Sequence, residues 1–104
     1  ENIRVPDSEI QKSIQSISSD LKNAIDLAYR NIEKFHSSQK LSSEVIETSP
    51  GVKCWRKSVP IEKVGLYIPG GSAPLFSSIL MLGIPAQIAA CKEVISCQPF
   101  MYTS

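Results

Sequence analysis

The chain has 104 residues, with 11 Lys and Arg against 10 Asp and Glu, and 42% of its residues are hydrophobic. This composition excludes a disordered chain, a collagen and a disulfide-rich scaffold, and a net charge of +1 gives no reason to expect a nucleic-acid or membrane-surface partner. A self-sufficient domain of this length buries roughly 60–70% of its unfolded surface.

The ends of the sequence predict that it belongs to a longer protein. It begins at Glu1 without a methionine or a signal-type segment, and it ends at Ser104 directly after an apolar run. We therefore expect residues 1–104 to form a single partial domain. Its predicted parts, in chain order, are a helical segment over residues 8–38, a β-hairpin over residues 44–60 and a βαβ unit over residues 63–98.

The helical segment shows the period of amphipathic helices. Apolar side chains recur at steps of three and four from Ile10 to Phe35, which places them on one face. Ser8 opens a capping-box pattern, and the Ser-rich stretch of residues 16–20 predicts a break before a longer helix over residues 19–38. The polar opposite face favours helices that lie on a core, and a coiled-coil partner helix is the alternative.

Residues 44–60 predict a β-hairpin. Two short strand-like runs flank Pro50 and Gly51, which supply the dihedral angles of a tight turn. Four basic side chains and one acidic side chain lie in residues 53–63. A solvated edge strand, on which lysine discourages aggregation, is the favoured interpretation, and a phosphate-binding patch is the alternative.

Residues 63–98 predict a βαβ unit with parallel strands. Residues 64–68 form a nearly continuous apolar run, typical of a strand buried on both faces, and residues 93–97 predict its partner. Residues 74–91 have the apolarity of a crossover helix, which Pro85 is expected to kink or split. A membrane span is the alternative, disfavoured by the prolines and by the strands on both sides.

The residues themselves offer little catalytic chemistry. A Gly-rich turn at residues 70–72 precedes a helix, where an anion could bind, but it matches no nucleotide-binding motif and a structural turn explains it equally well. The single histidine, His36, has no spaced partner for a metal site or a catalytic triad. The three cysteines form no Cys-x-x-Cys pair, which predicts reduced thiols in an intracellular protein. We therefore assign no catalytic residue and no metal ligand.

Residues 64–86 (VGLYIPGGSAPLFSSILMLGIPA) and residues 87–94 (QIAACKEV) closely resemble the histidinol dehydrogenases. The resemblance extends upstream to residues 31–36 (NIEKFH) and to Pro50-Gly51-Val52, so that it spans nearly the whole chain. The sequence departs from the family at Ala90, where glycine is more frequent, and after Pro99, where a Pro-rich continuation is expected.

The resemblance implies an NAD- and zinc-dependent oxidoreductase that converts L-histidinol through the aldehyde to L-histidine, in histidine biosynthesis. It also implies a homodimer in the cytoplasm, or in plastids, and an incomplete Rossmann-like α/β fold of aldehyde-dehydrogenase-like topology. The NAD-contacting tyrosine of the family falls on Tyr67, for which a buried strand aromatic is the alternative. The family's zinc ligands (Gln, His, Asp, His) and its Glu-His acid/base pair match no position here.

Two other hypotheses compete with this assignment. One is a piece of an aldehyde dehydrogenase, whose crossover helix has a similar proline pattern, and the other is a non-enzymatic interaction module built on residues 19–38. The predicted parallel strands would leave a sheet edge open where the remainder of a longer protein should pair, so we expect the chain alone to form homo-oligomers. The expected contacts are Leu75, Phe76, Ile79 and Leu80 together with that edge.

Overall fold

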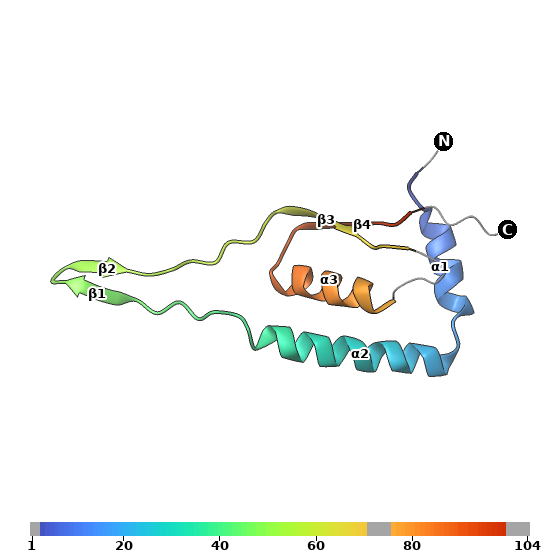
Figure 1. Cartoon of the computed structure of the whole chain (residues 1–104), viewed down its shortest axis with the longest axis horizontal. Helices are drawn as coiled ribbons and strands as arrows, with labels where there is room; N and C mark the ends of the chain where they lie inside the picture. Colours follow the sequence, from blue (N-terminus) through green and yellow to red (C-terminus); the bar gives the residue numbers. More distant parts are fainter. Residues whose placement is uncertain (1–2, 71–75, 100–104) are drawn as a thin grey trace.

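The computed structural model describes residues 3–70 and 76–99 (Figure 1). Helices, a hairpin and a βαβ unit follow one another in these ranges, which confirms the predicted α/β class. The elements, in chain order, are α1 (Asp7–Ser16), α2 (Ser19–Ser37), β1 (Ile46–Ser49), β2 (Val52–Cys54), β3 (Lys63–Tyr67), α3 (Phe76–Ile88) and β4 (Glu93–Cys97).

Helices α1 and α2 are separated where the Ser-rich stretch predicted a break. The Oγ atom of Ser18 accepts a hydrogen bond from the Leu21 amide at 3.3 Å, so this serine is the N-cap of α2. The predicted capping box at Ser8 is wrong. Helix α1 instead begins after Pro6, whose carbonyl oxygen accepts from the amides of Glu9 and Ile10 at 3.1 and 3.2 Å, and no side chain caps it.

Strands β1 and β2 form the predicted hairpin, with Ile46 opposite Cys54 and Glu47 opposite Lys53. Gly51 has a φ of 81°, a left-handed conformation that side chains rarely adopt, and its amide donates to Glu47 Oε1 at 2.9 Å. The hairpin lies at the tip of two extended legs, far from the helices (Figure 1). The sequence predicted the turn because proline and glycine encode it locally.

The parallel pair β3–β4 lies on α3, and α3 lies on α2, so two helical layers cover one face of the pair (Figure 1). Lys63 pairs with Glu93 at one end and Tyr67 with Cys97 at the other. The residues of β3 are exposed or half-buried. The prediction of a strand buried on both faces is therefore wrong for this chain, because the described residues supply a helical layer on one face alone.

Helix α3 runs without interruption from Phe76 to Ile88 and contains Pro85. The prediction that Pro85 splits the helix is wrong, because the residue lies in the last turns and its own carbonyl oxygen still accepts from the Ala89 amide at 2.9 Å. Pro74, the predicted first-turn residue, lies outside the described residues. No helix among the described residues combines the length and the apolarity that crossing a membrane requires.

Helix α3 ends at a left-handed residue that is not glycine. Ala90 has a φ of 65°, and the Cys91 amide donates back to the Ala86 carbonyl oxygen at 3.2 Å, which is a glycine-type helix ending. A side chain in this conformation costs about 1–2 kcal/mol, whereas glycine costs about 0.4–1 kcal/mol in chain entropy. We therefore expect Ala90→Gly, made in the full-length protein, to raise its free energy of unfolding by about 0.5–1 kcal/mol, measured by urea denaturation.

Ala89→Gly is the matched control for this substitution. Ala90 is the one non-glycine residue with positive φ in the described ranges, so glycine at position 89 relieves no strain and should destabilise the protein. Equal destabilisation by the two substitutions would contradict the account of Ala90.

The described chain buries little apolar surface. Ile68 and Ile84, which are 4% and 2% exposed, are the buried hydrophobic side chains among the described residues. The accessible surface is 9304 Å², whereas a compact protein of 11.4 kDa exposes about 5,800 Å². The radius of gyration is 19.1 Å, against about 13 Å for a compact domain of this length. The chain thus buries about 44% of its unfolded surface and lacks the core of a self-sufficient domain.

The 104-residue chain alone is expected to form dimers or larger assemblies. Phe76 and Ile79 on α3 are 63% and 40% exposed, and monomers rarely tolerate large apolar patches. Leu80 is half-buried, and Leu75 lies outside the described residues. Sedimentation velocity at micromolar concentrations measures this association. A single monomer boundary of 11.4 kDa together with cooperative thermal unfolding would contradict the expectation.

Candidate functional site

The candidate site is the edge of the parallel pair where both strands have their carboxyl ends. Tyr67 is the last residue of β3, lies opposite Cys97 at the end of β4, and is 64% exposed. The phenol is thus exposed among the described residues, and its role as a cofactor contact stays a prediction. In open α/β sheets, ligands bind outside the carboxyl ends of the strands, so Tyr67 occupies a position suited to a ligand contact.

Ile68 holds this edge in place. Its side chain is 4% exposed, and its amide donates to the Cys97 carbonyl oxygen at 2.8 Å, one residue beyond the end of the ladder. A buried side chain and a backbone hydrogen bond directly after Tyr67 fix the backbone that carries the phenol. The aromatic ring therefore stands on a rigid element although the ring itself is exposed.

The two strand segments that form this edge are uncharged. Residues 64–70 and 94–99 contain no Asp, Glu, Lys or Arg. The ion pairs Lys63–Glu93 and Lys92–Glu62, each at 3.7 Å, lie at the opposite, amino ends of the strands. These strand ends can therefore pack against a flat ring and exchange one hydrogen bond through the Tyr67 hydroxyl, but their own side chains offer no charge to a phosphate.

The predicted anion-binding turn falls mainly outside the described residues, which stop at Gly70 and resume at Phe76. Its role remains a prediction. The site described here thus rests on the strand ends and on Tyr67.

His36 takes part in a local contact at the end of α2. Its Nδ1 atom lies 2.8 Å from Gln39 Oε1, and its ring meets Phe35 edge-on at a centroid distance of 5.3 Å. The described residues contain no group of three or more His, Cys, Asp or Glu side chains that could hold a metal ion. The three cysteines are free thiols.

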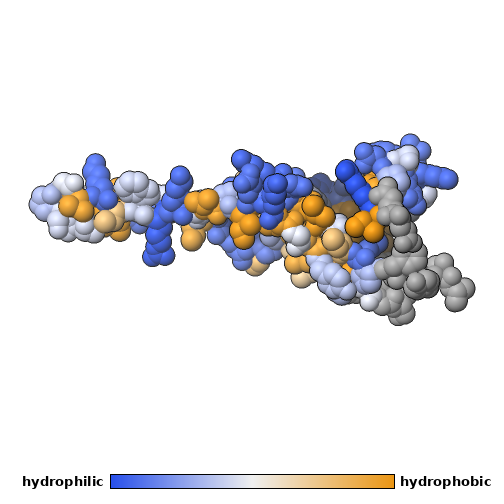
Figure 2. Space-filling model, turned by 90° about the horizontal axis from the view of Figure 1, so that it is seen from above, coloured by the Kyte–Doolittle hydropathy of each residue, from blue (hydrophilic) through white to orange (hydrophobic). Residues whose placement is uncertain are grey.

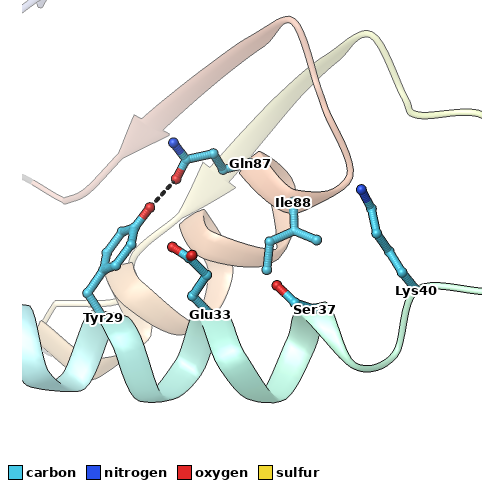
Figure 3. A pocket seen from close by; sticks show the side chains of 6 residues that line it. All are labelled: Tyr29, Glu33, Ser37, Lys40, Gln87 and Ile88. Carbon is cyan, nitrogen blue, oxygen red and sulfur yellow. Dashed lines mark hydrogen bonds between the residues drawn. The ribbon is translucent and has the colours of Figure 1, made fainter.

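A second feature, which the sequence analysis missed, is an open pocket of about 290 Å³ between α2 and α3 (Figure 3). The Tyr29 hydroxyl donates to Gln87 Oε1 at 2.6 Å and joins the two helices. Because these residues are 58 positions apart, no local pattern could predict the contact. The other lining residues are Glu33, Ser37, Lys40 and Ile88. Because the pocket is open and lined by both an acidic and a basic side chain, we interpret it as a polar contact between the two helices.

The parallel strands, the crossover helix and the exposed edge define a βαβ unit of an α/β protein. The family model of histidinol dehydrogenase matches residues 1–104, and the chain belongs to this family. The resemblance noted in the sequence is thus confirmed. The alternatives of an aldehyde dehydrogenase and of a helical interaction module are wrong.

Individual relatives agree with this assignment. The chain is 59% identical over 97 residues to a histidinol dehydrogenase of Bacteroides thetaiotaomicron, covering 93% of this chain and 23% of the relative. It is 54% identical over 99 residues to that of Vibrio parahaemolyticus, covering 95% and 23%. The crystal structure of histidinol dehydrogenase from Elizabethkingia anophelis matches with a TM-score of 0.89 and 57% identity, covering 94% and 23%. The chain thus spans about a quarter of the length of these relatives.

Proposed function

We propose that the protein containing this chain oxidises L-histidinol to L-histidine with NAD, in two successive hydride transfers of histidine biosynthesis. The family match over residues 1–104 is the observation that carries the proposal. Identities of 51–59% to relatives named histidinol dehydrogenase support it. We further propose that the protein works as a zinc-dependent homodimer in the cytoplasm, or in plastids if it comes from a plant.

Tyr67 is the residue through which we propose that this chain contacts NAD. Its exposure of 64%, its place at the carboxyl end of β3 and the uncharged strand ends beside it suit the packing of a flat ring against the phenol. When bound, NAD supplies the hydride acceptor. The chain's own part is to orient the dinucleotide through a side chain whose backbone Ile68 and Cys97 hold in register.

The described residues do not fit a zinc site. They contain no cluster of three or more potential ligands, so the zinc ligands and the acid/base pair of the proposed reaction belong to other segments of the protein. No step of the reaction is therefore derived through zinc from these residues.

Turnover by the full-length protein tests the proposed function. Purified protein incubated with limiting L-histidinol and excess NAD is expected to form two NADH for each histidinol consumed, with histidine as the product. Formation of one NADH per histidinol would contradict the two-step oxidation. Absence of NADH, with the protein shown folded and zinc-loaded, would contradict the function itself.

A further inference from the structure

The face of the parallel pair that α3 leaves uncovered has a gap in its row of side chains. Along β3 the exposure alternates, with half-buried residues at positions 64 and 66 and exposed residues at positions 65 and 67. Since side chains alternate between the two faces of a strand, Gly65 and Tyr67 share the face opposite α3. The pair lies above α3 in Figure 1, so the view from above in Figure 2 looks onto this face, where apolar surface is exposed.

The conformation of β3 does not require a glycine at position 65. The ladder between β3 and β4 is regular over its whole length and contains no bulge. The φ of Gly65 lies outside the left-handed region that favours glycine. Glycine weakens the interior of a strand relative to alanine, and where it forms neither a bulge nor a bend it commonly marks a place that a ligand or another backbone approaches closely.

The space above Gly65 is open in the described part of the chain. A Cβ atom at this position would meet no atom of the described residues within 4 Å, its chain neighbours aside. Ile95 pairs with Gly65 and is 53% exposed, so its side chain borders this space on β4. Tyr67, 64% exposed, borders it toward the carboxyl end of β3. We call this space the Tyr67 slot, with Gly65 as its floor and with Ile95 and Tyr67 as its walls.

The Tyr67 slot is wide enough for a flat ring because residue 65 lacks a side chain. Side chains two residues apart on one face of a strand stand about 6.6 Å apart. A planar ring in contact with the Tyr67 phenol lies about 3.5–4 Å from it and needs about the same distance again to the next side chain. An ordinary side chain at position 65 would therefore exclude the ring, whereas glycine admits it.

The chemistry of the Tyr67 slot suits a heteroaromatic ring. Its walls are one aromatic and one aliphatic side chain, and residues 64–70 and 94–99 contain no Asp, Glu, Lys or Arg. A flat ring packs on such a surface through its face. The slot also lies beside the carboxyl ends of two parallel strands, where α/β sheets bind their ligands.

We propose that Gly65 is a specificity-determining residue for NAD, because its missing side chain admits one of the two flat rings of the dinucleotide to the Tyr67 slot. The proposal rests on the proposed function and adds a residue that touches the cofactor through its backbone. It explains a glycine that neither the ladder nor the φ angle requires. The alternative occupant, another segment of the protein, is an outcome of the test.

Isothermal titration calorimetry of NAD into the full-length protein tests the proposal. Gly65→Ala fills the floor of the slot, and Gly83→Ala in α3 is the matched control, because a Cβ atom there also meets no described atom within 4 Å. We expect Gly65→Ala to raise the dissociation constant for NAD at least fivefold and Gly83→Ala to change it less than twofold. Urea denaturation should show no loss of stability in either variant, because alanine is favoured over glycine inside strands and helices.

An unchanged dissociation constant for NAD in a folded Gly65→Ala protein would overturn the proposal. A Gly65→Ala protein that loses stability or fails to fold, while Gly83→Ala folds, would also overturn it, because another segment of the protein would then fill the space above Gly65. NADH formation from histidinol by the wild-type protein is scored separately. A wild-type protein that binds NAD without turnover contradicts the proposed reaction alone, and one that does not bind NAD contradicts both proposals.

A double-mutant cycle shows whether Gly65 acts through the Tyr67 slot. In a Tyr67→Ala background one wall of the slot is absent, so Gly65→Ala should raise the dissociation constant for NAD less than twofold further. Full additivity of the two substitutions would overturn the proposal. AMP and nicotinamide mononucleotide, titrated into the wild-type and Gly65→Ala proteins, distinguish the two rings of NAD. Loss of affinity for one of these probes is expected, and unchanged affinity for both would overturn the proposal.

Discussion

The isolated 104-residue chain is expected to produce no NADH from histidinol and to hold no zinc after a chelator wash. The described residues contain no cluster that could bind a metal, and the chain's single histidine is engaged with Gln39 and Phe35 at the end of α2. Hydride transfer from an alcohol requires a base that accepts the hydroxyl proton, and the contacts that the described residues give His36 are with Gln39 and Phe35, not with a carboxylate. The expected effect is a complete loss relative to the full-length protein.

Metal analysis and an NADH assay check this expectation. The full-length protein, washed with the same chelator and reloaded with zinc, serves as the positive control. One tightly held zinc per 104-residue chain would contradict the prediction. So would NADH formation above a blank that lacks histidinol.

Tyr67→Ala in the full-length protein should raise the apparent KM for NAD about tenfold and that for histidinol less. The phenol lies exposed at the carboxyl end of β3, and the substitution removes a ring-packing or hydrogen-bond contact of about 1–2 kcal/mol. A loss of about 1.4 kcal/mol corresponds to a tenfold change. Initial rates measured while one substrate is varied at saturation of the other separate the two constants.

Tyr67→Phe is the control that separates the ring from the hydroxyl. If packing against the aromatic face carries the contact, phenylalanine preserves most of the affinity for NAD, and if the hydroxyl carries it, phenylalanine behaves as alanine does. Calorimetric unfolding establishes that each variant keeps its fold. An unchanged KM for NAD in a folded Tyr67→Ala protein would make Tyr67 a structural residue.

Locally encoded features of the fold were predictable from the sequence. Pro50 and Gly51 specify the hairpin turn, Ser18 caps α2, and the apolar runs on either side of α3 become parallel strands. The capping box predicted at Ser8 does not form, because Pro6 supplies a backbone acceptor two residues earlier and the helix begins there. The prediction for Pro85 failed because this residue lies in the last turns of α3, where its own carbonyl oxygen still accepts from the Ala89 amide.

The candidate site was predictable in position but not in environment. The end of an apolar strand before a Gly-rich turn places Tyr67 at the ligand edge of a parallel pair. Its exposure depends on which layers cover the sheet, and that is a property of distant segments rather than of the strand. The Tyr29–Gln87 hydrogen bond was missed for the same reason, since it joins helices that meet through tertiary packing alone.

The two ion pairs at the amino ends of β3 and β4 have a consequence for strand alignment. Lys63 pairs with Glu93 and Lys92 pairs with Glu62, at 3.7 Å each. Each of the four side chains is at least half exposed, so the two ion pairs contribute little to stability. Their signs alternate along each strand. A slip of one residue in one direction would set Lys63 beside Lys92, and a slip in the other would set Glu62 beside Glu93. Either slip also turns the strand's side chains to the opposite face, away from α3. Four surface charges that add little stability therefore disfavour both neighbouring strand registers. They thereby help to keep Tyr67 opposite Cys97, at the carboxyl ends of the two strands.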